Sequence, residues 1–137
     1  MHWIHDDGGR AATGFKGETR DCVTRAIAIA TGRPYREVYA ALNVAAEHER
    51  GSRSNARTGV KKATIRNFMK TLGWTWHPTM AIGQGCKTHL RREELPGGRI
   101  VAAVSKHLVA VVDSVVHDTH DSTRDGTRCV YGYWTNA

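Results

Sequence analysis

The stretch that most constrains the fold covers residues 17–32 and reads GETRDCVTRAIAIATG. It predicts a short helix, because apolar residues continue around most of the helical surface between Cys22 and Gly32. Thr19 or Asp21 can act as the N-cap by accepting a hydrogen bond from an amide that lacks a helical partner. Gly32 is a natural end, since helices often finish with a residue at positive φ. A helix that is apolar on nearly every side is expected to be buried at the centre of the molecule.

Cys22 falls in the first turn of this predicted helix, and that position has a chemical consequence. The unpaired amides and the positive end of the helix dipole stabilise a thiolate there. The thiolate is the nucleophilic form of cysteine, so Cys22 is a candidate nucleophile. The competing interpretation is that Cys22 is a small buried apolar residue, as is common for free cysteines.

Length and composition are those of an ordinary globular chain. The 137 residues are 40% hydrophobic and 24% charged, which predicts one compact domain spanning 1–137. No apolar run approaches the roughly 20 residues that cross a bilayer, and the opening MHWIHDD lacks the basic and apolar regions of a signal peptide. We therefore expect a cytoplasmic protein without membrane contact.

The cysteines and the net charge narrow the expected chemistry and partners. Cys22, Cys86 and Cys129 are an odd number without a CxxC pair, which argues against a disulfide framework and against a structural zinc site and fits a reducing compartment. The formal net charge of +7 permits contact with nucleic acid or another acidic partner. The competing interpretation is a solvated basic surface, because the basic residues are spread along the chain.

The remaining pattern predicts an α+β fold in which N-terminal helices pack on a C-terminal antiparallel sheet. We expect an extended arm at 1–16, helices at about 34–48 and 61–72, and a mobile loop at 49–59. A short strand at 74–76 and a short helix near 90–95 follow. The sheet is expected to hold strands at 99–104, 107–112, 115–119 and 129–134.

The register of one predicted hairpin brings a histidine close to a carboxylate. If Asp113 and Ser114 are the two central residues of a tight turn, Val109 opposes Asp118, and His107 opposes a position two residues beyond Asp118. Residues that oppose each other share a face of the sheet, and a diagonal neighbour on that face is within reach. Asp118 can therefore contact the imidazole of His107. Asp113 cannot, because it lies six residues along the strand, about 20 Å away.

These residues complete the parts of a nucleophilic site. Cys22 supplies the thiolate, His107 pairs with it and later protonates the leaving group, and Asp118 fixes the orientation of the imidazole. The competing interpretation is that His107 only caps a strand and Asp118 only ends one. The ordered set of cysteine, histidine and aspartate favours the catalytic interpretation.

The blocks DCVTRAIAIATG, YREVY and HLVAVVDSVVHDT resemble the papain-like cysteine peptidases, over about residues 15–134. The resemblance is strongest to the small members that process bacteriocins and to small phage-encoded relatives. It implies a papain-like fold, a peptide or protein substrate, no cofactor, and a catalytic triad of Cys22, His107 and Asp118. For a phage-encoded chain it also implies the cytoplasm of the host cell.

The sequence departs from the papain-like pattern at the oxyanion position. Such enzymes usually hold a glutamine several residues before the cysteine, whereas Lys16 stands six residues before Cys22 and no glutamine precedes it. Lys16, Thr19 or the backbone amide of Cys22 could take over this role.

A metal site is the competing interpretation of four histidines, two near the start of the sequence and two at positions 117 and 120. The candidate ligands are His2, His5, His117, His120, Asp6, Asp7, Asp118 and Asp121. Neighbouring residues such as His117 and Asp118 point to opposite faces of a strand, which spoils a compact site, so we expect no metal.

Two functions remain open from the sequence. The first is thiol-dependent cleavage of a peptide or isopeptide bond, for which acyl transfer to an amine is a variant that uses the same three residues. The second is a non-catalytic papain-like protein, of phage origin, that binds a host protein or nucleic acid as an inhibitor. The missing glutamine and the charge of +7 favour binding, and the order of Cys22, His107 and Asp118 favours the enzyme.

Overall fold

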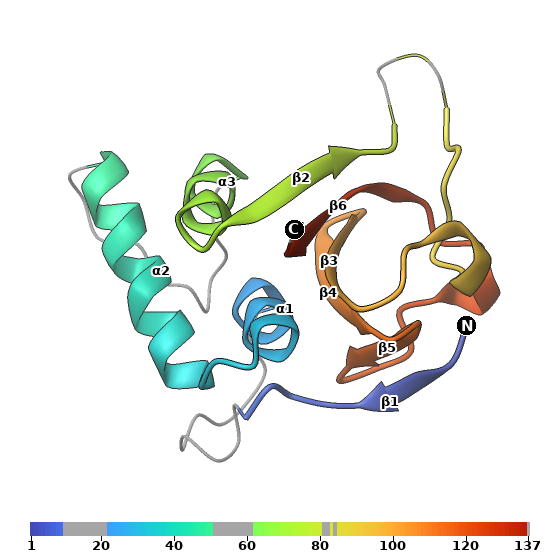
Figure 1. Ribbon diagram of the computed structural model, residues 1–137, viewed down its shortest axis with the longest axis horizontal. Helices are drawn as coiled ribbons and strands as arrows, with labels where there is room; N and C mark the ends of the chain where they lie inside the picture. Colours follow the sequence, from blue (N-terminus) through green and yellow to red (C-terminus); the bar gives the residue numbers. More distant parts are fainter. Residues whose placement is uncertain (10–21, 51–61, 81–82, 84, 137) are drawn as a thin grey trace.

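The computed structural model describes residues 1–9, 22–50, 62–80, 83 and 85–136. In that part of the chain the fold is α+β, with three α-helices and one six-stranded mixed sheet. The helices are α1 (Cys22–Thr31), α2 (Tyr35–Arg50) and α3 (Lys62–Thr71). Figure 1 shows α1 between α2 and the sheet, so the apolar helix predicted from the sequence lies at the centre of the described fold.

The helix ends follow the sequence signals, with one shift. Gly32 and Gly73 have φ of +73° and +81° and lie just after α1 and α3, and the end at Gly32 is the one predicted above. α2 continues to Arg50, so the first two residues of the predicted loop at 49–59 are helical. Residues 51–59 lie outside the described part of the chain.

The sheet has the strand order β1-β5-β4-β3-β6-β2. Its strands are β1 (Trp3–His5), β2 (Trp74–Pro78), β3 (Arg99–Val104), β4 (His107–Val112), β5 (Val115–Asp118) and β6 (Val130–Asn136). β1 pairs with β5 in parallel, and the other neighbours are antiparallel. The prediction of a C-terminal antiparallel sheet is therefore incomplete, because β1 and β2 come from earlier in the chain.

β1 corrects the prediction of an extended arm at 1–16. Residues 3–5 of that arm form a sheet strand, and residues 10–16 lie outside the described part of the chain. The three residues of β1 read WIH, which does not alternate between apolar and polar as a half-buried strand does. All three are exposed in the structure. Pairing with β5 through partners such as Ile4 and His117 creates the strand.

The β4–β5 hairpin has the register that the sequence predicted. Val112 pairs with Val115, and Val111 pairs with Val116. The two turn residues, 113 and 114, both have positive φ, at 50° and 67°. This is the backbone of a two-residue turn whose twist matches the flanking strands.

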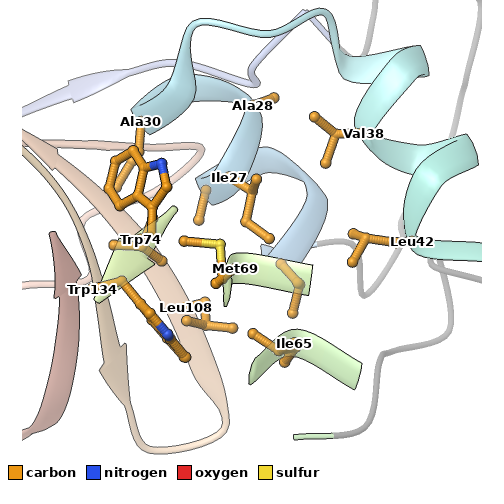
Figure 2. Packing of buried hydrophobic residues seen from close by; sticks show 14 residues of the cluster. Ile27, Ala28, Ala30, Val38, Leu42, Ile65, Met69, Trp74, Leu108 and Trp134 are labelled. Atoms are coloured by element: carbon orange, nitrogen blue, oxygen red, sulfur yellow. The ribbon is translucent and has the colours of Figure 1, made fainter. Parts of the chain in front are cut away.

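Two apolar clusters cover the two faces of the sheet. Figure 2 shows the cluster that joins the helices to the sheet, with Ile27 of α1, Met69 of α3 and Leu108 of β4 among its members. The second cluster holds Val109 and Val111 of β4, with other residues from β3, β5 and β6 and from the segment before β3. β4 therefore alternates between the clusters, and burial on both sides makes it a rigid support for the residue that begins it.

The segment between β2 and β3 holds two further corrections. Where a short helix was predicted near 90–95, the structure has a single 3₁₀ turn, Arg92–Glu94. Cys86, in the same segment, forms a disulfide with Cys129, which lies just before β6, although the odd number of cysteines argued against a disulfide framework. The two cysteines are 43 residues apart, and their segments meet at the isolated bridge between His89 and Cys129.

None of the described helices is both long enough and apolar enough to serve as a membrane span.

Candidate active site

Cys22 is the first residue of α1, in the position that the sequence predicted. α1 runs beside β4 in the same direction: Cys22 accepts a hydrogen bond from the amide of Leu108 at the start of β4. At the other end, the carbonyl of Ile29 accepts a hydrogen bond from Arg99, 2.9 Å away, and Arg99 pairs with Val112 at the end of β4. The packing of an apolar helix along a buried strand thus places the sulfur beside residue 107. The proposed N-caps, Thr19 and Asp21, lie outside the described part of the chain.

His107 begins β4 and Asp118 ends β5, so the hairpin brings both side chains to the same end of the sheet. The Nε2 atom of His107 lies 2.6 Å from Oδ2 of Asp118. The predicted contact between this histidine and this carboxylate is therefore confirmed. Its catalytic role stays a prediction.

The Cys22 thiol hydrogen-bonds to the His107 ring, which completes a chain of sulfur, imidazole and carboxylate. Nε2 of the His107 ring bonds Asp118, so Nδ1 is the nitrogen of this ring that is left to bond the sulfur. One carboxylate therefore sets both the orientation of the ring and the nitrogen that faces Cys22.

Three pKa values depart from their ordinary range at this site. Burial opposes ionisation of Cys22, but the hydrogen bond and charge of His107 outweigh it and lower the pKa of the thiol. Burial also disfavours the charged imidazole, yet the bonds to Asp118 and Cys22 raise the pKa of His107 to about 9. Burial opposes ionisation of Asp118 too, and its hydrogen bond with His107 lowers its pKa to about 2. All three pKa values are therefore shifted in the direction that favours a thiolate, an imidazolium and a carboxylate.

Arg25 is a member of the site that the sequence reasoning missed. Its guanidinium lies 3.5 Å from Oδ1 of Asp118, and both side chains are buried. Its charge also contributes to the lowered pKa of Cys22, which lies one turn earlier on α1. The signal was present in the sequence, because Arg25 is the one charged residue in the helix CVTRAIAIAT. A buried charge in such a helix requires an anionic partner.

Asp118 is held by three neighbours besides the histidine ring of His107. The amide of Thr119 donates to Oδ1 at 2.7 Å, Arg25 lies on the same oxygen, and Nδ1 of His120 lies 4.0 Å from it. The His120 ring is 5.4 Å from the His107 ring, centroid to centroid. Of the described residues, His107, Asp118 and His120 offer ligand atoms that all lie within 4.8 Å of one another.

Three of the other candidates for a metal site have partners outside this cluster. Nδ1 of His117 pairs with Asp6 at 3.1 Å. Asp121 accepts hydrogen bonds from the amide and hydroxyl of Thr123 instead. The expected alternation of His117 and Asp118 along β5 thus sends the two residues to different partners.

The oxyanion candidates Lys16 and Thr19 lie outside the described part of the chain. All three cysteines lie within it, and Cys22 is the free one. Cys86 and His89 are three residues apart, a spacing that can supply two metal ligands. In the structure they have separate partners, since Cys86 is disulfide-bonded and His89 contacts Glu94 at 3.2 Å.

No protein-family model, no curated protein and no solved structure matches this chain. The geometry of the site and the chemistry of its residues therefore carry the functional argument.

Proposed function

We propose that this protein is a papain-like thiol hydrolase that cleaves a peptide or isopeptide bond through an acyl-enzyme. The observation that carries the proposal is the hydrogen-bonded chain of Cys22, His107 and Asp118 at one end of the sheet. The papain-like fold is supported by the order of the elements, with the cysteine at the start of a central helix and the histidine and aspartate on successive strands.

In the first half of the reaction, the Cys22 sulfur attacks the carbonyl carbon of the substrate. The imidazolium of His107 gives its Nδ1 proton to the leaving amine, the carbon–nitrogen bond breaks, and a thioester remains on the sulfur. The pKa of His107 is raised to about 9, so the proton is in place at neutral pH. Asp118 keeps the ring aligned and stabilises its positive charge.

In the second half, water attacks the thioester while Nδ1 of His107 accepts its proton. The acid product leaves, and the thiolate–imidazolium pair is restored. An amine in place of water gives acyl transfer through the same steps. In both halves the substrate oxygen becomes negative, and the amides of the first turn of α1 are donors that lack helical partners.

The test is cleavage of a diverse peptide library by the full-length protein at neutral pH, with fragments identified by mass spectrometry. The wild type is expected to yield fragments that Cys22→Ala does not. His117→Ala is the matched control, since this residue pairs with Asp6 and not with the sulfur. Equal cleavage by the wild type and Cys22→Ala would overturn the proposal.

The same proteins test the non-catalytic alternative. A binding protein that uses its net charge of +7 would retard nucleic acid in a gel equally well with and without Cys22, and added salt would weaken the complex. That result, together with a library that stays intact, would favour binding over hydrolysis.

A further inference from the structure

His120 stands beside the catalytic pair without a role in the proposed mechanism. Its side chain is 59% exposed, whereas those of His107 and Asp118 are buried or nearly so. Its Nδ1 atom lies 4.0 Å from Oδ1 of Asp118 and 3.4 Å from the hydroxyl of Thr119. An exposed imidazole that faces a buried imidazole and a carboxylate forms a donor set of two nitrogens and one oxygen.

We propose that His107, Asp118 and His120 form a reversible binding site for a divalent transition-metal ion, of which Zn²⁺ is the best match. The ligand atoms of these three residues already lie within 4.8 Å of one another. Imidazole suits zinc and the later first-row metals, whereas Mg²⁺ and Ca²⁺ prefer sites made of oxygen. Three protein ligands with one open position for water is a common arrangement for zinc.

The adjustments that the site needs are small. Zinc–nitrogen and zinc–oxygen bonds of about 2.1 Å in a tetrahedron place neighbouring ligand atoms about 3.4 Å apart. Nε2 of His107 and Oδ2 of Asp118, now 2.6 Å apart, have to separate, and His120 has to move closer. His120 is exposed and can rotate with little loss of packing, and the contact with Thr119 that it gives up is long, at 3.4 Å.

Metal binding at this position changes the chemistry of His107. The ion takes the lone pair of Nε2, and the proton that this nitrogen shared with Asp118 leaves to solvent. The remaining proton, on Nδ1 of a neutral metal-bound imidazole, is a weaker acid than that of an imidazolium. The bound ion therefore deprives the leaving amine of its proton donor, a consequence that rests on the proposed hydrolase function.

Two features limit the affinity and make the site reversible. The guanidinium of Arg25 lies 3.5 Å from Oδ1 of Asp118 and repels a cation, so Oδ2 is the oxygen open to the metal. Oδ2 is also held by Nε2 of His107 at 2.6 Å, and this contact has to break before the ion can enter. A site of this kind responds to the concentration of free metal, as a regulatory site does and a structural zinc site does not.

The experiment is titration of the full-length protein with ZnCl₂ by isothermal calorimetry, repeated with Co²⁺ followed by its visible absorption. We expect one ion per chain for the wild type and at least tenfold weaker binding for His120→Ala. His117→Ala is the matched control, since it removes a neighbouring histidine of the same hairpin and should change the affinity less than twofold. Cys22→Ala should also bind, because the sulfur is not among the ligands.

Equal affinity of His120→Ala and the wild type, or an equal loss in His117→Ala, would overturn the metal site. Because His120 is exposed, thermal unfolding should confirm that His120→Ala folds as the wild type does. Binding is measured without substrate, so failure of the metal site and failure of the hydrolase are separate results. Where a cleavable peptide is found, the concentration of Zn²⁺ that halves its cleavage should rise in His120→Ala by the same factor as the dissociation constant. An unchanged half-inhibiting concentration would contradict the site.

Discussion

The β4–β5 hairpin takes part in two histidine–aspartate pairs, and the pairs differ in the features that a reactive site needs. His107 and Asp118 lie 2.6 Å apart, with 12% and 4% of their side chains exposed. His117 and Asp6 lie 3.1 Å apart, with 18% and 34% exposed. The residue types are the same, and burial differs most at the carboxylate.

The neighbours of the two pairs differ further. The His107–Asp118 pair has a thiol on one side and the buried Arg25 on the other, and His107 uses Nε2 for its carboxylate, which leaves Nδ1 for the sulfur. His117 uses Nδ1 for Asp6. A histidine–aspartate contact is therefore not sufficient for a reactive site: the free nitrogen must face a nucleophile, and burial must strengthen the charges.

The largest difference between the pairs should appear in catalysis. We expect His107→Ala to slow cleavage of any peptide substrate by about 10²–10⁴-fold, because it removes the proton donor and acceptor. His117→Ala should stay within about twofold of the wild type. The measurement is kcat/KM of both variants on the same peptide, and a similar loss in both would remove the distinction between the pairs.

The next largest difference is expected in the free energy of unfolding, when either Asp118 or Asp6 is replaced. Asp118→Ala leaves Arg25 and an imidazolium buried without their anion, and we expect a loss of about 3–5 kcal/mol in the free energy of unfolding. Asp6→Ala breaks a more exposed pair and should cost about 1 kcal/mol or less. Urea denaturation at pH 7 measures both values, and equal losses would mean that burial does not distinguish the pairs.

The change in the free energy of unfolding at acidic pH is a smaller expected effect, and its sign follows from the lowered pKa of Asp118. The pKa of Asp118 is lowered to about 2, so its stabilisation is present above its ordinary value of 3.8 and is lost as the pH falls toward 2. Asp118→Asn should therefore lose about 2 kcal/mol less than the wild type between pH 5 and pH 2. Asp6→Asn should lose nearly as much of its free energy of unfolding as the wild type does between pH 5 and pH 2. Urea denaturation across this range measures the loss in all three proteins.

Between pH 6.5 and 9 the two proton shifts at the Cys22–His107 pair oppose each other. The raised pKa of His107 gives stability that is fully present below 6.5 and is lost as the pH rises through about 9, whereas the lowered pKa of Cys22 adds stability as the pH rises. Cys22→Ala removes the second contribution, and it leaves the part of the raised His107 pKa that comes from Asp118. Its free energy of unfolding should therefore fall more steeply than that of the wild type over this range, and parallel profiles would speak against the pair.

Arg25 should have the smallest effect on reactivity. Arg25→Met removes its charge with little change in side-chain volume, and the pKa of Cys22 should rise. We expect alkylation of Cys22 at pH 6 to slow only a few-fold, since His107 gives the larger contribution. Arg33→Met is the control, because Arg33 is exposed and pairs with Glu37. An effect of Arg33→Met equal to that of Arg25→Met would point to net charge and not to position.

Local rules predicted the elements that carry the site. Positive-φ glycines ended α1 and α3, and a two-residue turn set the register that brought Asp118 to His107. These features depend on a few neighbouring residues, so the sequence contains them. Cys22 lies in the first turn of α1, as the sequence predicted from the apolar pattern of that helix.

The features that the sequence did not predict depend on contacts between distant segments. β1 is a strand only through its pairing with β5, and the disulfide of Cys86 with Cys129 joins segments that no local pattern connects. Arg25 was overlooked because the apolar character of its helix hid the one charge in it. Helix propensity tolerates arginine at such a position, and the structure shows the buried carboxylate of Asp118 as an anionic partner for it.

The central claim is that Cys22 and His107 form a thiolate–imidazolium pair. Its most direct test is the rate of iodoacetamide alkylation of Cys22 from pH 4 to pH 10, without reductant so that the disulfide stays closed, in the wild type and in His107→Ala. The account predicts substantial reactivity at pH 6 in the wild type, a further change near pH 9 where His107 loses its proton, and loss of the low-pH reactivity in the variant. A single rise near the ordinary thiol pKa of about 8.5, identical in both proteins, would contradict it.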